Sequence, residues 1–217
     1  MSSRNKAKIR TMYRILFKAF GPQHWWPGDT PFEVAVGAIL TQNTSWGNVE
    51  KAIDHLKAAH ALSAKKIHEM PATTLAAFIR PAGYFNIKAK RLKSFIRFLC
   101  EHYGGSMKRM KKEDARILRE KLLSVHGIGP ETADSILLYA LEKPIFVIDA
   151  YTKRILSRHD IIGHKEPYSA FQKLFHVSLG RDVRLFNEYH ALFVATGKSF
   201  CKPKPLCKEC PLMSLKP

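Results

Sequence analysis

The chain has 217 residues, of which 46% are hydrophobic, so it can bury the core of one domain or of two small interlocked ones. Its 36 Lys and Arg residues against 18 Asp and Glu residues give a formal net charge of +18, which predicts a polyanionic partner. No apolar run reaches the roughly 18 residues of a membrane span, and residues 1–20 lack the apolar block of a signal peptide, so neither a membrane protein nor a secreted one is expected.

The N-terminal 20 residues are basic with apolar residues at helical spacing, and we predict an amphipathic helix there. Trp25 and Trp26 follow, directly before Pro27. Two adjacent tryptophans are compatible with core packing and with an aromatic binding surface, and both interpretations stay open at this point.

A helix start follows at Thr30, where Pro31 suits the first helical position and Glu33 completes a capping box. Apolar periodicity extends this helix to about residue 40. Further helices are expected at 47–59, 63–69, 72–79, 86–103, 113–124, 130–141, 149–157, 167–179 and 184–197. Because almost no segment alternates as a strand does, the predicted fold class is all-α.

The segment VHGIGPETA, residues 125–133, predicts a hairpin turn between two helices. Gly127 and Gly129 flank Ile128, and glycine permits both a tight turn and a close approach of another molecule to the backbone. Pro130 suits the first turn of the second helix. Amides at such a turn form an anion site, and in so basic a chain the expected anion is a DNA phosphate.

Asp149 stands 20 residues after Gly129, behind the apolar residues 145–148 and at the start of a predicted helix. One interpretation is an ordinary helix N-cap, which Asp fills well. Another is a carboxylate held for chemistry, and its position after the hairpin favours this second interpretation.

The order of hairpin, aspartate and cysteine-rich tail resembles the helix-hairpin-helix DNA glycosylases of the endonuclease III superfamily, with the 3-methyladenine DNA glycosylases as the most similar branch. The resemblance extends from Pro31 to Cys210. It implies that the hairpin grips the phosphate backbone of double-stranded DNA and that a damaged base is extruded from the duplex. Asp149 would be the catalytic residue, stabilising positive charge on the sugar and orienting or deprotonating water.

The resemblance also implies two helical lobes. We expect a central helical domain at 31–133 that ends in the hairpin, and a second domain formed by 1–30 together with 134–217. Asp149 is expected to face the cleft between them. A monomer is expected.

Glu131 departs from the bifunctional members of the superfamily, which have a lysine two residues after the second hairpin glycine. A lysine amine attacks the sugar and forms a Schiff base that permits strand cleavage, and a carboxylate cannot do this. The sequence therefore predicts a monofunctional glycosylase. A charge that merely stabilises a helix N-terminus is compatible with the same position.

Three further residues are candidates for contact with DNA. Gln42 corresponds to the glutamine that fills the gap left by the extruded base, and Tyr84 to the apolar residue that wedges into the base stack. His126 lies in the hairpin itself, where a histidine could meet a phosphate. Each residue could instead pack its own loop.

The aromatic residues favour an alkylated purine as the substrate. Trp26, Pro27 and Trp46, together with Glu131, are expected to line the base pocket, as in glycosylases that hold the base between aromatic faces. An alkylated purine is cationic, and a cation over an aromatic ring gains about 0.5–2 kcal/mol. Trp25 is compatible with a core position.

The tail spacing Cys201-x5-Cys207-x2-Cys210 resembles the four-iron, four-sulfur cluster loop of the superfamily. The fourth cysteine, expected near Lys216, is missing, and Cys100 lies in a predicted helix. Either a different residue completes the cluster or the loop is a relic; a zinc knuckle is a third alternative, although no histidine follows Cys201. Disulfides are not expected, because we predict a cytoplasmic, nucleoid-associated protein.

The leading prediction is a glycosylase that hydrolyses alkylated purines of the 3-methyladenine type from DNA. A related glycosylase for oxidised pyrimidines, for uracil or thymine mismatches or for mispaired adenine is the alternative. A non-catalytic helix-hairpin-helix DNA-binding protein is the alternative of another class, and Asp149 argues against it.

Overall fold

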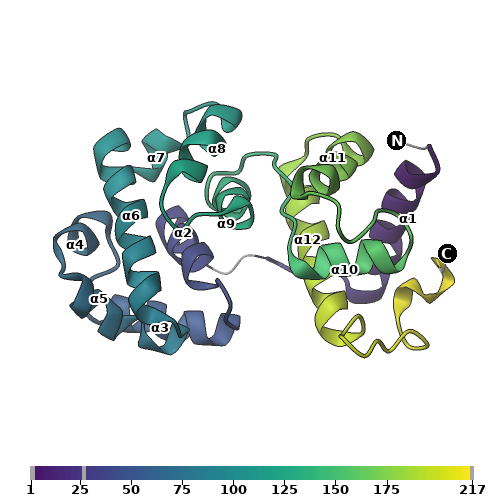
Figure 1. Cartoon of the computed structure of the whole chain (residues 1–217), viewed down its shortest axis with the longest axis horizontal. Coiled ribbons are helices and arrows are strands. Elements are labelled where there is room, and N and C mark those ends of the chain that lie inside the picture. The colour runs from purple at the N-terminus through teal and green to yellow at the C-terminus, as the bar shows by residue number, and fades with distance from the viewer. Residues whose placement is uncertain (1–2, 26–27, 216–217) are drawn as a thin grey trace. The chain divides into compact units, whose positions relative to one another are not determined.

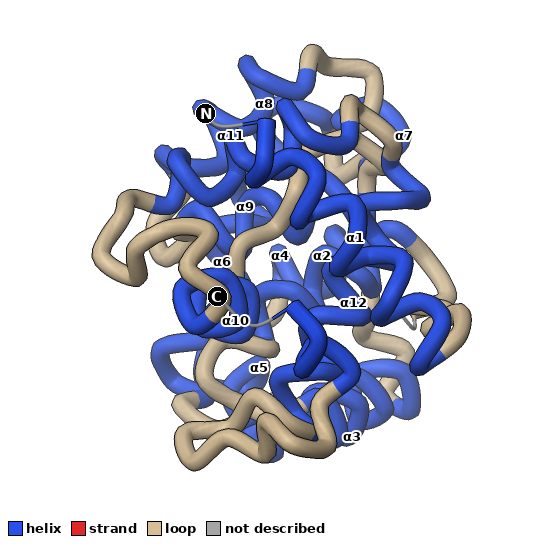
Figure 2. The backbone as a smooth tube through the Cα atoms, turned by 90° about the vertical axis from the view of Figure 1, so that its right-hand side faces the viewer, coloured by secondary structure: helices blue, strands red, loops and turns tan. Residues whose placement is uncertain are grey.

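The computed structural model describes residues 3–25 and 28–215, and Figure 1 shows them as two units. Unit 1 consists of residues 1–26 and 144–217, and unit 2 of residues 27–143. All regular elements in the described ranges are helical (Figure 2), which confirms the all-α prediction. In these same ranges no helix has the length and apolar character needed to cross a membrane.

Unit 2 is built around α2 (Pro31–Leu40), whose last eight residues are all buried. Thr30 caps this helix as expected, since its side chain accepts a hydrogen bond from the amide of Glu33. The surrounding helices are α3 (Trp46–Ala58), α4 (Ala64–Glu69), α5 (Ala72–Phe78), η1 (Arg80–Ala82), α6 (Phe85–Tyr103), α7 (Met107–Met110), α8 (Ala115–Ser124), α9 (Pro130–Ser135) and η2 (Ile136–Ala140).

Unit 1 joins the N-terminal helix to the C-terminal part of the chain. Its helices are α1 (Ser3–Phe20), α10 (Ala150–Arg158), α11 (Tyr168–Leu179), α12 (Val183–Ser199) and η3 (Pro211–Leu215). An aromatic core holds them together: Phe146 stacks on Phe175 at 3.6 Å, and Tyr189 stacks on Phe193 at 4.7 Å between ring centroids.

The predicted helices are confirmed to within a few residues, but the short elements η1, α7 and η3 were not predicted, and one predicted helix changes its type. The short helix α7 was not expected, because four residues are too few for apolar periodicity to be visible. The helix expected at 130–141 is α-helical only to Ser135 and then widens into the π-helical η2. Such widening is frequent near functional sites.

Candidate functional site

The hairpin of unit 2 joins α8 to α9 through residues 125–129, as predicted. Gly127 has φ +83°, and a Cβ at this position would overlap the side chain of Arg91. Gly129 is different: its φ is −90°, and nothing lies within 4 Å of the position that a Cβ would take. One glycine is therefore required by the fold, whereas the other leaves open space beside the turn.

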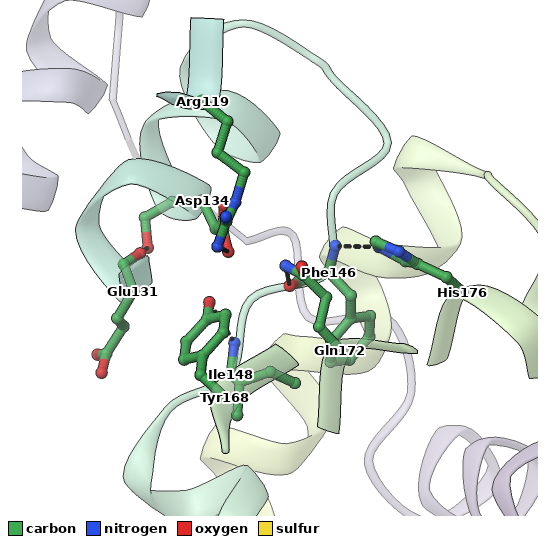
Figure 3. A network of polar contacts seen from close by, with 9 residues as sticks. Arg119, Glu131, Asp134, Phe146, Ile148, Tyr168, Gln172 and His176 are labelled. Atoms are coloured by element: carbon green, nitrogen blue, oxygen red, sulfur yellow. Dashed lines mark hydrogen bonds and ion pairs between the residues drawn. The ribbon is translucent and has the colours of Figure 1, made fainter. Parts of the chain in front are cut away.

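A partly buried ion pair fixes the two helices of the hairpin against each other. Arg119 of α8 donates from Nε to Oδ1 of Asp134 at 2.6 Å and from Nη2 to Oδ2 at 3.1 Å. Asp134 is fully buried in α9, and Figure 3 shows the guanidinium over its carboxylate. A bidentate pair of this kind constrains orientation as well as distance, so it sets the angle at which the turn is presented.

Gln42 is tied to the hairpin by its side chain. Its Nε2 donates to the carbonyl of Gly127 at 3.1 Å and to Oγ1 of Thr132 at 2.9 Å, and its Oε1 accepts from Arg91. Since Arg91 also packs on Gly127, the loop that contains Gln42 and the hairpin form one connected polar network.

Tyr84 has an unusual backbone conformation for a bulky residue. It lies before α6 with φ 45° and ψ 31°, in the left-handed region, and its side chain is 68% exposed. An aromatic residue that is both strained and largely exposed gains little from packing, and strain of this kind is frequent at functional positions.

Lys88 connects the loops that contain Gln42 and Tyr84. Its buried ammonium donates to the carbonyl of Leu40 at 2.8 Å and to that of Ala82 at 2.7 Å. These carbonyls lie at the ends of α2 and η1, directly before the two loops. Burial, assisted by the positive charge of Arg91, lowers the pKa of Lys88 to about 8.

In unit 1 an extended segment leads to Asp149, and side chains of α11 form hydrogen bonds with the backbone of this segment. The amide of Phe146 donates to Nε2 of His176 at 3.1 Å, and that of Ile148 donates to the hydroxyl of Tyr168 at 3.1 Å. Gln172 donates to the carbonyl of Phe146 at 2.8 Å. Because Tyr168, Gln172 and His176 are spaced by four residues, they share one face of α11 (Figure 3).

Asp149 is buried at the end of this segment and has two contacts. Its Oδ1 accepts a hydrogen bond from the amide of Thr152 at 2.7 Å, which makes it the N-cap of α10. Its Oδ2 lies 3.6 Å from Nε2 of His190 on α12. The N-cap interpretation is therefore correct, and one carboxylate oxygen remains outside the capping bond.

Other predicted site residues are placed as follows. Trp46 opens α3 and donates from its indole nitrogen to Glu50 at 2.7 Å. Glu131 is exposed in the first turn of α9, and His126 is exposed in the hairpin, whereas Ile128 is buried. Trp26 and Pro27 lie outside the described residues.

The cysteines of the tail share a pocket in unit 1. Cys201, Cys207 and Cys210 line a cavity of about 210 Å³ whose other walls are mainly apolar. Arg158 donates to the sulfur of Cys201 at 3.3 Å. Cys100 lies in α6 and is not part of this lining.

Cysteine thiols that line one cavity are the donor type that an iron–sulfur cluster takes. Within residues 3–25 and 28–215, no three Cys, His, Asp or Glu side chains are close enough to hold one metal ion. In a four-iron cluster each thiolate binds its own iron, so the sulfur atoms need not converge on one point. The three cysteine thiols lie around one mainly apolar pocket, and the guanidinium of Arg158 lies beside one of them; this arrangement suits such a cluster. The tail itself does not supply the fourth ligand that the cluster needs.

Sequence reasoning missed the residues that support Asp149. His190 and the polar face of α11 contact Asp149 or its segment from more than 18 positions away along the chain. The four-residue spacing of Tyr168, Gln172 and His176 was visible, but an exposed polar face of a helix has the same pattern.

The chain is similar to proteins of DNA repair. Residues 36–180 match a family model described as the HhH-GPD superfamily of base excision DNA repair proteins. A candidate DNA repair glycosylase of Methanocaldococcus jannaschii is 49% identical over 94% of this chain and 93% of that protein. Endonuclease III of Thermotoga maritima is 29% identical over 93% of this chain and 89% of that enzyme.

Solved structures show the same similarity. A 3-methyladenine DNA glycosylase of H. pylori, bound to 1,N6-ethenoadenine, matches with a TM-score of 0.77 at 30% identity. The match covers 89% of this chain and 97% of that enzyme. A non-covalent endonuclease III–DNA complex has a TM-score of 0.83 at 21% identity and covers 100% of this chain with 96% of its own, which shows the fold alone.

Proposed function

The chain belongs to the HhH-GPD superfamily of base excision DNA repair proteins, and we propose that it is a DNA glycosylase that hydrolyses alkylated purines of the 3-methyladenine type. The observation on which this proposal rests is the buried carboxylate of Asp149, held at the end of an extended segment in a chain that also has a glycine hairpin. Phosphate binding does not require a buried carboxylate, and the capping bond of Asp149 uses only one of its two oxygens.

In the proposed reaction Asp149 acts on the sugar. Cleavage of the N-glycosidic bond leaves positive charge on the deoxyribose, and an ionised carboxylate stabilises that charge. The same carboxylate orients or deprotonates the water that attacks the sugar carbon, while the base leaves with the bond electrons. The hydrogen bond from the amide of Thr152 and those from α11 to the preceding segment hold the carboxylate in place without help from the substrate.

The residues of unit 2 are proposed to bind the duplex. The open space at Gly129 admits a phosphate to the backbone of the hairpin. Tyr84, exposed and strained, is the wedge that enters the base stack, and Gln42 occupies the gap left by the extruded base. His126 is exposed in the same turn, and we propose that it contacts the DNA backbone.

Two observations support an alkylated purine as the substrate. The 30% identical enzyme of H. pylori is a 3-methyladenine DNA glycosylase. Trp46 is the described aromatic residue of the proposed pocket, and since its N–H is already bonded to Glu50, it would act on a base through its ring. A cationic base gains from such a ring and is itself a good leaving group, so strong acid catalysis is unnecessary.

Release of free bases from duplexes with single lesions tests this substrate. We expect release of 3-methyladenine and related cationic purines, and no release from undamaged DNA. Release of oxidised pyrimidines, of uracil or thymine from mismatches, or of mispaired adenine, without release of 3-methyladenine, would refute the choice of lesion but keep the glycosylase.

Glu131 supports a reaction without strand cleavage. Its exposed carboxylate stands in the first turn of α9, where an amine would be needed for a Schiff base with the sugar. Borohydride reduces Schiff bases to stable adducts, so treatment during turnover is expected to trap no protein–DNA complex. A trapped complex would show that another amine of the chain is the nucleophile.

The cysteine pocket of unit 1 is proposed to hold a four-iron, four-sulfur cluster, with Cys201, Cys207 and Cys210 as thiolate ligands. When bound, the cluster would link the tail to α10 and α12. The lysines of the tail, such as Lys202, Lys204 and Lys208, are exposed and would then be ordered beside the DNA backbone. Iron and sulfide content after anaerobic reconstitution tests this part of the proposal.

A further inference from the structure

His159 lines the same pocket as the three cysteines of the tail. We propose that His159 is the fourth ligand of the cluster, in place of the cysteine that the tail lacks. This inference rests on the cluster proposed above. This ligand precedes the cysteines in the chain and stands at the C-terminal end of α10.

The hydrogen bond of His159 identifies the atom that would bind iron. Nδ1 of His159 lies 3.0 Å from the carbonyl oxygen of Leu215. A carbonyl can only accept, so Nδ1 holds the proton, and the lone pair of the neutral ring is on Nε2. Metal-binding histidines are usually oriented in this way, with the other ring nitrogen donating to a backbone carbonyl.

The residue that accepts this hydrogen bond from His159 is next in the chain to the position of the missing cysteine. Leu215 directly precedes Lys216, the position at which the family spacing places the fourth cysteine. The fold therefore brings an imidazole to the part of the tail where the thiolate is missing.

Two arginines of α10 hold the first cysteine in the same region. Arg154 donates from Nε to the carbonyl of Cys201 at 2.6 Å. Arg158, which precedes His159, donates to the sulfur of Cys201 at 3.3 Å and to the carbonyl of Lys202 at 2.7 Å. Donors to sulfur stabilise a thiolate and tune the reduction potential of a cluster. The C-terminal end of α10 thus contacts the tail both at Cys201 and at Leu215.

Imidazole is a chemically reasonable substitute for thiolate. Histidine replaces cysteine on iron in Rieske centres, where the loss of negative charge raises the reduction potential. A cluster bound by three thiolates and His159 is therefore expected to have a higher reduction potential than the same cluster bound by four thiolates. This sign distinguishes a ligand from a residue that only anchors the tail.

The experiment compares the full-length wild type with three variants after anaerobic reconstitution with ferrous iron and sulfide. His159→Asn keeps a donor for the carbonyl of Leu215 but provides a poor ligand for iron. His159→Cys offers a thiolate in the same place. His164→Asn is the control, because His164 is an exposed histidine of the same unit. Iron and sulfide per chain, electron paramagnetic resonance and the reduction potential are measured for each.

We expect the wild type and His164→Asn to bind equal amounts of iron and sulfide. His159→Asn should lose one iron and show the resonance of an oxidised three-iron cluster, or lose the cluster, while its metal-free form unfolds at the same temperature as metal-free wild type. His159→Cys should keep the cluster at a lower reduction potential. Unchanged iron, resonance and potential in His159→Asn would refute the ligand but leave the cysteine cluster standing. A wild type that binds no iron would refute both.

Discussion

Oδ2 of Asp149 lies 3.6 Å from Nε2 of His190, and both side chains are buried in unit 1. Burial lowers the pKa of His190, while the negative charge of Asp149 raises it to a smaller extent. The imidazole is therefore neutral at pH 7, and the contact is not an ion pair. His190 therefore does not neutralise the carboxylate of Asp149.

Asp149→Asn separates the two roles of this residue. Asparagine caps a helix as well as aspartate does, so the bond from Thr152 is kept and the free energy of unfolding should change by less than about 0.5 kcal/mol. The charge is lost, and we expect base release to fall by about 10²- to 10⁴-fold in single-turnover assays. Binding of the duplex should be retained.

Asp149→Ala and Asp182→Ala provide the controls. Asp182 caps α12 by accepting from the amide of Leu185 at 3.0 Å. Both alanine variants lose a cap and should cost about 1 kcal/mol, but only Asp149→Ala should also lose activity. Full activity in Asp149→Asn would exclude this carboxylate from the chemistry.

The buried His190 predicts a pH dependence of stability. Its pKa is lower in the folded chain than the value of about 6.5 in the unfolded chain. The unfolded state therefore binds the proton first, and stability falls as the pH decreases from about 6.5. In His190→Gln this fall should be shallower, as measured by urea unfolding between pH 5 and 7. His164→Gln is the matched control and should keep the wild-type slope.

An NMR titration tests the coupling of the pair directly. In Asp149→Asn the negative charge that favours the imidazolium is gone, so the pKa of His190 should fall further. An unchanged pKa would contradict the contact.

Local sequence patterns predict the helices of this chain but not the long-range contacts of its candidate site. Apolar spacing and caps predict the helices, because both are local: Thr30 and Asp149 cap the helices that follow them. The buried Lys88, the backbone of Tyr84 and the position of His159 depend on contacts with distant segments, which no local pattern encodes. For Glu131, the sequence alone shows that this position has no amine to form a Schiff base, and the structure adds that the side chain is exposed.

Lys88→Met tests whether the two loops depend on one buried ammonium. The variant leaves the carbonyls of Leu40 and Ala82 without their donor, at a cost of about 1–3 kcal/mol in the free energy of unfolding. Displacement of the loops with Gln42 and Tyr84 should weaken binding to a lesion-bearing duplex by roughly tenfold, or about 1.4 kcal/mol.

Lys93→Met is a close chemical match for this variant. Lys93 lies on the same helix and donates to the carbonyls of Ile67, His68 and Met70, at the end of α4. It should also lose stability but bind DNA as the wild type does. Equal loss of binding in both variants would show that the effect is global and not transmitted through the loops.

The pKa of Lys88 gives a second measurement of the same residue. Its value of about 8 lies below that of about 10.4 in the unfolded chain, so above pH 8 the unfolded state binds more protons. The free energy of unfolding should therefore rise with pH between 8 and 10 in the wild type, relative to Lys88→Met.

The two hairpin glycines predict opposite outcomes when each is replaced by alanine. Gly127→Ala forces a side chain into a positive φ and against Arg91, so we expect a loss of stability of about 1–3 kcal/mol. Removing the arginine as well, in Gly127→Ala/Arg91→Ala, should recover the part of this loss that is due to overlap. Thermal unfolding measures both.

Gly129→Ala has no such cost, because φ is −90° and the space around the added methyl group is open. Its stability should be unchanged or higher by up to about 1 kcal/mol, since alanine restricts the unfolded chain. That open space is where the proposed phosphate approaches, so the methyl group should weaken binding to an undamaged duplex by about tenfold. Binding equal to that of the wild type would mean that DNA does not contact the hairpin at this residue, because no change in folding could hide the effect.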